Sequence, residues 1–286
     1  MDRRLYICAA ALAVAACAGH MAPSATSAPT RAAVAAPAAP AEPVALRYAA
    51  DAGHYRFESQ SHIEQEAMGQ TTAFDLSTGV LLSVAVADAA GNLGVAITID
   101  SLGITSPVGV PAASDLAAAK GQIVRLVLSP QGQMISLSPP DSASSAVRQV
   151  AQGFREFLPM LPPGSTAAGT TWTDTTSMTT PSQGVAVTVH MTRQHRVVGW
   201  EDHAGTRALH LATTTAYTLT GSGESQGQSV ELTGGGQRTG DAFVTAAGVY
   251  LGGTTSDSSL VNANVVSAGI VVPVRSRTHS SFTRLP

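Results

Sequence analysis

Cysteine is almost absent from this chain of 286 residues. It occurs twice, at Cys8 and Cys17, and both positions fall in the first seventeen residues. The rest of the chain therefore has no residue that could form a disulfide bond or supply a thiolate to a metal. A folded domain made from it must be held together by its core alone, which a chain of this length can do.

Charge is also scarce. Asp, Glu, Lys and Arg make up 12% of the residues, and the formal net charge is −3. A nucleic-acid-binding domain needs a basic face that neutralises phosphates, and this composition provides no cluster of Lys and Arg to form one. We therefore expect that the protein has no nucleic-acid partner.

The sequence motifs of common catalytic sites are missing as well. There is no Gly-x-Ser-x-Gly motif, and Gly221-Ser222-Gly223 is typical of a turn. His62-Ile63-Glu64 lacks the second histidine of a zinc protease, and Gly234-Gly235-Gly236 lacks the Lys-Ser/Thr of a phosphate loop. Four histidines form the only cluster in the sequence, but no pair has the spacing of zinc ligands, so we predict that they lie on strands in contact with solvent: His190, His195, His203 and His210. We interpret acidic residues such as Asp174 as ordinary surface carboxylates. We expect no enzyme activity, no metal and no cofactor.

An apolar run near the N-terminus is too short to span a membrane. Residues 5–16 give about twelve apolar positions, whereas a membrane-spanning helix needs roughly twenty. Arg3 and Arg4 precede the run, and Val14-Ala15-Ala16-Cys17 ends it. A basic start, a short apolar run and small residues are the pattern of a secretory signal. We predict that residues 1–17 are a signal peptide.

The end of this segment resembles the bacterial lipobox, in which an aliphatic residue and two small residues precede a lipid-modified cysteine. The resemblance implies that Cys17 becomes the mature N-terminus and carries acyl chains. Each buried methylene contributes about 0.8 kcal/mol, so more than one chain gives stable membrane anchoring. A cleaved signal without lipid, or a cysteine without a role, are the alternatives. With the lipid, the protein belongs to the cell envelope, at the outer membrane, in the periplasm or at the cell surface.

Residues 18–45 consist mainly of Ala, Pro, Ser and Thr. They contain almost no large apolar residue, so they cannot form a core. Prolines that interrupt a helix recur through the segment: Pro23, Pro29, Pro37, Pro40 and Pro43. We predict a disordered tether with a reach of roughly 30 Å, which holds the following domain away from a membrane.

Residues 46–286 carry the pattern of one domain made mainly of β-strands. Val, Ile and Thr recur in short alternating runs; Val95, Ile97 and Ile99, for example, share one strand face. Glycine-containing turn signals separate the runs, as at 89–92 and 129–132. We predict strands joined as an antiparallel meander, including one at 123–128, and a short helix over 114–119.

Residues 142–161 form the one extended helical pattern. Val147, Val150, Phe154, Phe157 and Leu158 recur at helical spacing, and Pro159 and two further prolines end the pattern. An apolar stripe of this kind favours a helix packed on the sheet as core. The alternative is a helix that lines a concave cavity.

The order of several stretches carries a further resemblance, beginning with the lipobox cysteine, the Pro-rich tether and a strand reading His54-Tyr55-Arg56-Phe57. Leu158-Pro159-Met160-Leu161-Pro162 leads into Gly169-Thr170-Thr171-Trp172, and this order resembles a group of uncharacterised bacterial lipoproteins. The layout is also similar to the half-barrel of lipoprotein carriers and of mycobacterial lipid-carrying lipoproteins. That resemblance implies a curved antiparallel sheet or open half-barrel, with one main amphipathic helix on its concave face. It also implies an apolar cavity of a kind suited to a lipid or other hydrophobic ligand, and it shows no ligand.

The candidate ligand-binding residues are the apolar side chains of the helix and the following tryptophan: Phe154, Phe157, Leu158 and Trp172. The alternative function is an envelope scaffold or protein-interaction module with a filled core and no small-molecule ligand. A continuous apolar cavity lined by Phe154, Phe157 and Leu158 indicates ligand binding, whereas a closed core argues against it.

The lipid anchor predicts that cells fed a radiolabelled fatty acid label the wild-type protein and not the Cys17→Ser variant. The serine hydroxyl replaces the thiol that the acyl chains require. The measurement is the radioactivity of the immunoprecipitated protein. Label on the variant equal to that on the wild type would show that Cys17 is not the anchor.

Overall fold

The computed structural model describes residues 45–67, 69–107, 113–140, 143–182, 184–225 and 227–286. Cys17, the predicted signal peptide and the predicted tether apart from residue 45 lie outside these described residues. None of the described helices is long and apolar enough to cross a membrane.

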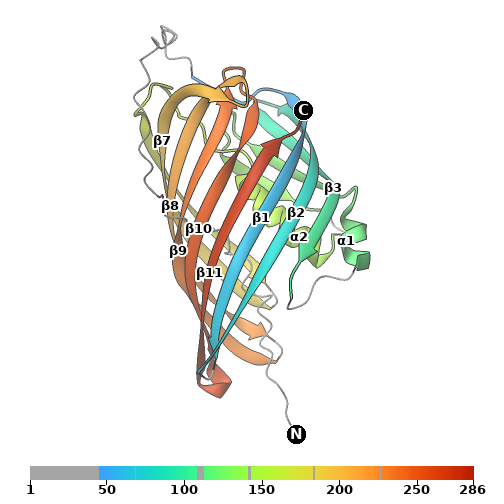
Figure 1. Ribbon diagram of the computed structural model, residues 1–286, viewed down its shortest axis with the longest axis vertical. Helices are drawn as coiled ribbons and strands as arrows, with labels where there is room; N and C mark the ends of the chain where they lie inside the picture. Colours follow the sequence, from blue (N-terminus) through green and yellow to red (C-terminus); the bar gives the residue numbers. More distant parts are fainter. Residues whose placement is uncertain (1–44, 68, 108–112, 141–142, 183, 226) are drawn as a thin grey trace, which may run out of the picture.

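The described residues form eleven strands, two α-helices and two 3₁₀ turns (Figure 1). The strands of the first half are β1 (Asp51–Ala67), β2 (Gln70–Ala89), β3 (Asn92–Thr105), β4 (Ile123–Leu128) and β5 (Met134–Ser138). Those of the second half are β6 (Thr171–Ser182), β7 (Val185–His203), β8 (Thr206–Ser225), β9 (Gln228–Thr245), β10 (Tyr250–Val265) and β11 (Ile270–Arg284). The remaining elements are α1 (Ala113–Ala119), α2 (Ser145–Gly153), η3 (Phe154–Glu156) and η4 (Val266–Ala268).

All strands belong to one antiparallel sheet in the order β5-β4-β3-β2-β1-β11-β10-β9-β8-β7-β6. Strands that follow one another in sequence pair along both halves, and the first strand, β1, pairs with the last, β11. Figure 1 shows that the sheet curls along its length into an open half-barrel, with α2 on the concave side. The predicted fold class is therefore confirmed.

Several predicted elements agree with the structure, and others differ. The strand at 123–128 coincides with β4, and the short helix predicted over 114–119 is α1. The helix predicted over 142–161 is too long, because α2 ends at Gly153 and the chain tightens into η3. Glycine is a poor helix former, which accounts for the end of α2 at this residue. At the other end the Ser144 side chain caps α2 by accepting a hydrogen bond from the Val147 amide.

Strand β9 runs without a break through Gly234, Gly235 and Gly236. The glycines are required by a close approach of the neighbouring strand. Tyr217 of β8 lies opposite Gly236, and a Cβ atom on Gly236 would lie 2.6 Å from the Tyr217 hydroxyl oxygen. The missing side chain therefore leaves room for the tyrosine ring on the concave face.

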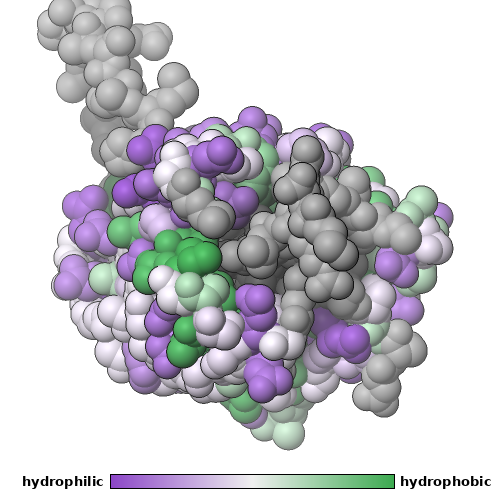
Figure 2. Space-filling view, turned by 90° about the horizontal axis from the view of Figure 1, so that it is seen from below, coloured by the Kyte–Doolittle hydropathy of each residue, from purple (hydrophilic) through white to green (hydrophobic). Residues whose placement is uncertain are grey.

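Two groups of buried apolar side chains occupy the concave side. The larger group, the main core, joins inward-facing residues of the sheet to residues 143–161, which we call the plug. The smaller group, the end core, lies where the β1–β2 and β10–β11 hairpins turn, at the lower end in Figure 1. Figure 2 looks onto this end and shows an apolar patch surrounded by polar residues. The β10–β11 hairpin exposes Val266 and Val271 there.

The close packing of Tyr217 on β9 predicts that Gly236→Ala destabilises the protein by roughly 1–3 kcal/mol, because the added methyl group displaces the ring or the strand. The free energy of unfolding in urea measures this. Gly79→Ala in β2 is the matched control, since no atom lies within 4 Å of its added Cβ. Equal stability of the two variants would contradict the packing argument.

Candidate functional site

A band of polar side chains separates the two cores on the concave face. Along β11, Phe282 packs on the main core and Val274 belongs to the end core, while Ser276, Thr278 and Ser280 lie buried between them. Strand β8 has the same arrangement, in which Leu211 belongs to the main core and Leu219 belongs to the end core. Its intervening inward residues are Thr213, Thr215 and Tyr217. We call this band the polar belt.

On β1 and β11 the polar belt consists of hydroxyl groups that satisfy one another. Thr278 donates to the hydroxyl of Ser61, and Ser280 donates to that of Ser59 at 2.9 Å. Buried hydroxyls that are hydrogen-bonded in this way cost little stability. This half of the belt therefore has no polar group left over for a ligand among the pairs described.

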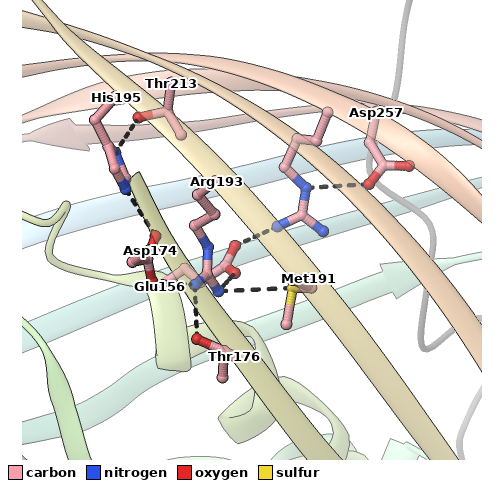
Figure 3. A network of polar contacts seen from close by, with 9 residues as sticks. Glu156, Asp174, Thr176, Met191, Arg193, His195, Thr213 and Asp257 are labelled. Carbon is pink, nitrogen blue, oxygen red and sulfur yellow. Dashed lines mark hydrogen bonds and ion pairs between the residues drawn. The ribbon is translucent and has the colours of Figure 1, made fainter. Parts of the chain in front are cut away.

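The other half of the polar belt carries charge, and its centre is Glu156 of η3 (Figure 3). Arg193 of β7 donates from Nη2 to Glu156 Oε1 at 2.6 Å. Arg238 of β9 donates from Nη1 to the second carboxylate oxygen, Oε2. The plug thus places one carboxylate between two guanidinium groups of the sheet.

Each arginine is also held from behind by a carboxylate of a neighbouring strand. Arg193 donates from Nη1 to Asp174 Oδ2 at 2.9 Å and to the Thr176 hydroxyl at 3.1 Å. Arg238 donates from Nε to Asp257 Oδ2 at 3.0 Å. These bonds fix the guanidinium planes so that their other N–H groups point at Glu156. The prediction of Asp174 as an ordinary surface carboxylate is wrong, since its side chain is only 20% exposed and paired.

The two carboxyl groups on either side of Arg238 have opposite pKa shifts. Burial by itself would raise the pKa of Glu156, but the charges of Arg238 and Arg193 outweigh it and lower the pKa to about 2. For Asp257 burial dominates and raises the pKa to about 6, although Arg238 and the hydrogen bond from Tyr217 oppose it. Glu156 is thus ionised at neutral pH, whereas the pKa of Asp257 lies close to neutral pH.

His195 and Trp172 extend the network toward the edge strand β6. The His195 ring lies 3.0 Å from Asp174 through Nε2 and 2.9 Å from the Thr213 hydroxyl through Nδ1. Burial lowers the pKa of His195, although Asp174 opposes this. The prediction of a solvated histidine is wrong here, because His195 shares the inward phase of Met191 and Val197 and is 5% exposed. The same phase in the sequence was the signal that could have identified it.

Trp172 stacks on the His195 ring with a centroid distance of 4.9 Å and an interplanar angle of 14°. Its indole N–H is buried and has no hydrogen-bond partner among the described residues. A buried donor without a partner costs roughly 1–3 kcal/mol, so this position is not optimised for stability alone. Trp172 packs against the main core at its polar border.

Three of the four predicted ligand-binding residues belong to the closely packed main core, and Trp172 is partly buried against it. Phe154 and Phe157 are each 1% exposed, and Leu158 is also buried. The Phe157 ring is surrounded edge-on by the rings of Tyr55, Tyr250 and Phe282, at centroid distances of 5.2, 5.6 and 5.4 Å. The apolar interior of the half-barrel is therefore filled by the plug in this structure, and this closed core argues against a preformed ligand cavity lined by Phe154, Phe157 and Leu158.

An open depression of about 530 Å³ lies over β6, β7 and β8 and includes none of the predicted site residues. Its exposed lining side chains are Thr175, Ser177, His190, Thr192, Ala216 and Thr218. Strand alternation places these residues on the outer face, whereas the other lining residues, Thr176, Met191 and Tyr217, have the inward phase of the polar belt. Hydroxyl groups and one histidine without a carboxylate among the lining residues provide no chemistry that we can assign.

A serine, a histidine and an aspartate meet on the outer face, but not in the order of a hydrolase. Ser83 donates to Asp100 Oδ2 at 2.7 Å, and its oxygen lies 3.1 Å from His54 Nδ1. In a catalytic triad the histidine lies between the other two residues and accepts the serine proton. Here the serine lies between them and its proton points to the aspartate. In the part of the chain that the structure describes, no three His, Cys, Asp or Glu side chains could hold a metal ion.

The pKa of Asp257 makes stability depend on pH. Because this pKa rises from 3.8 to about 6 on folding, protonated Asp257 stabilises the fold, and the contribution disappears as the pH rises through 6. Asp257→Asn removes the ionisation. The free energy of unfolding of Asp257→Asn minus that of the wild type should therefore increase by up to about 3 kcal/mol from about pH 4 to about pH 7.

Urea denaturation across this pH range measures the difference. Asp115→Asn, at an exposed position in the first turn of α1, is the matched control and should follow the wild type at every pH. Curves for Asp257→Asn that run parallel to those of the wild type would contradict the assigned ionisation.

Comparisons with known proteins give only distant similarities. No family model and no curated protein matches the chain. The crystal structure of Pseudomonas aeruginosa OccK2 (OpdF) aligns with 7% identity and a TM-score of 0.30, over 82% of this chain and 98% of that one. A DUF1329 family protein from Desulfovibrio piger aligns with 8% identity and a TM-score of 0.15, over 77% and 83%. A loop-deletion mutant of the Vibrio cholerae outer membrane protein OmpT aligns with 6% identity and a TM-score of 0.17, over 82% and 99%. These scores are below those that indicate a shared fold.

Proposed function

We propose that the protein is a lipid-anchored lipoprotein of the cell envelope whose half-barrel binds a hydrophobic or lipid-like ligand, and that it is not an enzyme. The anchor rests on the sequence pattern that ends at Cys17 and on the tether after it. The observation that carries the binding function is the plug, because a separate segment rather than the sheet itself fills the concave face.

The plug is joined to the rest of the molecule mainly by side chains. It forms no strand of the sheet. Two hydrogen bonds link its C-terminal part to neighbouring segments: the Leu161 amide donates to Gln131 O at 2.8 Å, and the Tyr48 hydroxyl donates to Pro159 O at 2.7 Å. Apolar contacts are non-directional, so a ligand with apolar groups of similar size can replace those of Phe154 and Phe157.

The charged half of the polar belt supports a functional role for the interior. Charges inside a protein are costly to desolvate, and apolar residues in their place are often neutral or stabilising. Arg193, Asp174 and Asp257 are all largely buried, and Asp257 has a side chain that is 0% exposed. Shifted pKa values and buried charges gather at functional sites more often than at purely structural ones.

A second candidate function is an envelope scaffold with a filled core. The observation in its favour is the close packing of Phe157 among Tyr55, Tyr250 and Phe282. The two functions differ in what the protein contains when it is purified from cells. A binding protein carries a ligand in some of its molecules, and a scaffold carries none.

Native mass spectrometry of the mature chain, exported through a signal without a lipobox, is expected to show a bound lipid that organic solvent removes. Phe157→Ala should raise the bound fraction, because it vacates the space between three aromatic rings. Leu260→Ala, on the outer face of β10 where Leu260 is 42% exposed, is the control and should leave it unchanged. Repeated preparations of all three proteins without any bound lipid would favour the filled-core scaffold.

A further inference from the structure

The two arginines of the polar belt form a receptor for one anionic group. Arg193 Nη2 and Arg238 Nη1 reach the two oxygens of the same carboxylate, although the arginines come from different, non-adjacent strands of the sheet. Guanidinium groups that converge in this way bind carboxylates and phosphates with charge-assisted hydrogen bonds. The anion present in this structure is Glu156, which belongs to the plug and not to the sheet.

The sheet holds this receptor without help from Glu156. Asp174 and Thr176 accept from Arg193, and Asp257 accepts from Arg238, so both arginines keep a partner when the plug is removed. The charges of the two arginines and the two aspartates then cancel, and burial disfavours a charge on His195. A neutral, preorganised site of this kind accepts one external anion in place of Glu156 without adding net charge to the present arrangement.

Glu156 is also the member of the network that solvent reaches most easily. Its side chain is 37% exposed, against 15% for Arg193 and 22% for Arg238. An external anion can therefore compete for the arginines from the side where Glu156 enters. The two aspartates are less exposed than Glu156, at 20% for Asp174 and 0% for Asp257, and they belong to strands of the sheet.

The neighbours of Glu156 in the plug indicate what kind of ligand competes. Phe154, Phe157 and Leu158 fill the main core beside the receptor, while Glu156 fills the receptor itself. The plug thus presents an anionic group joined to a set of apolar groups. We propose that Arg193 and Arg238 bind the carboxylate or phosphate head group of an anionic amphiphile, and that Glu156 occupies this site in the closed form. This inference rests on the proposed function and names the ligand class for it.

Isothermal titration of the mature chain with four probes tests the proposal. Dodecanoate and dodecyl phosphate carry chain and charge, 1-dodecanol carries the chain alone, and acetate carries the charge alone. Glu156→Gln removes the internal anion and keeps the side-chain size. Glu58→Gln, at an exposed position on the outer face of β1, is the matched control.

Dodecanoate, dodecyl phosphate or both should bind Glu156→Gln about tenfold more tightly than the wild type, and Glu58→Gln should equal the wild type. The second substitution Arg193→Gln, added to Glu156→Gln, should abolish the gain. 1-Dodecanol should bind all variants alike. The stronger of the two charged probes identifies the head group as a carboxylate or a phosphate.

If Glu156→Gln gains as much affinity for 1-dodecanol as for the charged probes, the head-group site is overturned and the proposed function stays intact. Acetate binding to Glu156→Gln as tightly as dodecanoate would overturn the amphiphile class. No binding of any probe to any variant would overturn the proposed function as well. If Glu156→Gln does not fold, hydrogen exchange of the wild type decides. Dodecanoate should speed exchange of the plug amides more than 1-dodecanol does, and equal effects would overturn the proposal.

Discussion

The ladder between β1 and β11 is the interaction on which the whole architecture depends. The strands of the described residues form two β-meanders, β1–β5 and β6–β11, and this pairing joins them into one sheet. The register runs from Tyr55 opposite Arg284 to Gln65 opposite Val274, and a paired Asp51 and Arg284 fasten one end. The ladder brings the two ends of the domain together, and the single sheet that results curls around the concave space. The charged residues of the polar belt on β6 to β10 therefore lie in the same sheet as the main-core strands β1 to β4.

The sequence predicted the features that depend on local pattern. Alternation and turn signals identified a mainly antiparallel sheet, and runs of apolar residues located β4 and α1. The length of α2 and the continuity of β9 depend on packing: at Gly153 the chain tightens toward the sheet, and at Gly236 the Tyr217 ring lies against the strand. Inward phase alone would have placed His195 on the concave face. The pairing of Glu156 with Arg193 and Arg238 could not be predicted, because it joins residues 37 and 82 positions apart through strand register.

The interior combines two requirements that conflict in most small β-proteins. The apolar cores at either end of the polar belt stabilise the curl by removing hydrophobic surface from water. The charged half of the belt between them weakens that stabilisation, because each buried charge must be compensated by partners at fixed positions. The structure resolves the conflict by placing every buried carboxylate of the network against an arginine or a histidine of a neighbouring strand. Only the carboxylate of Glu156 comes from outside the sheet, so it is the one whose departure leaves the remaining pairs intact.

The strands at the two edges of the sheet, β5 and β6, have a consequence for how the molecule can move. They are consecutive strands in the chain, and the segment that connects them contains the plug. The open side of the half-barrel is therefore closed by covalent linkage and side-chain packing, and not by a ladder of backbone hydrogen bonds. The distance between the edges can change without breaking any strand pair. If a ligand displaces the plug as proposed, the opening between β5 and β6 would widen with it, while the β1–β11 ladder at the opposite wall stays paired.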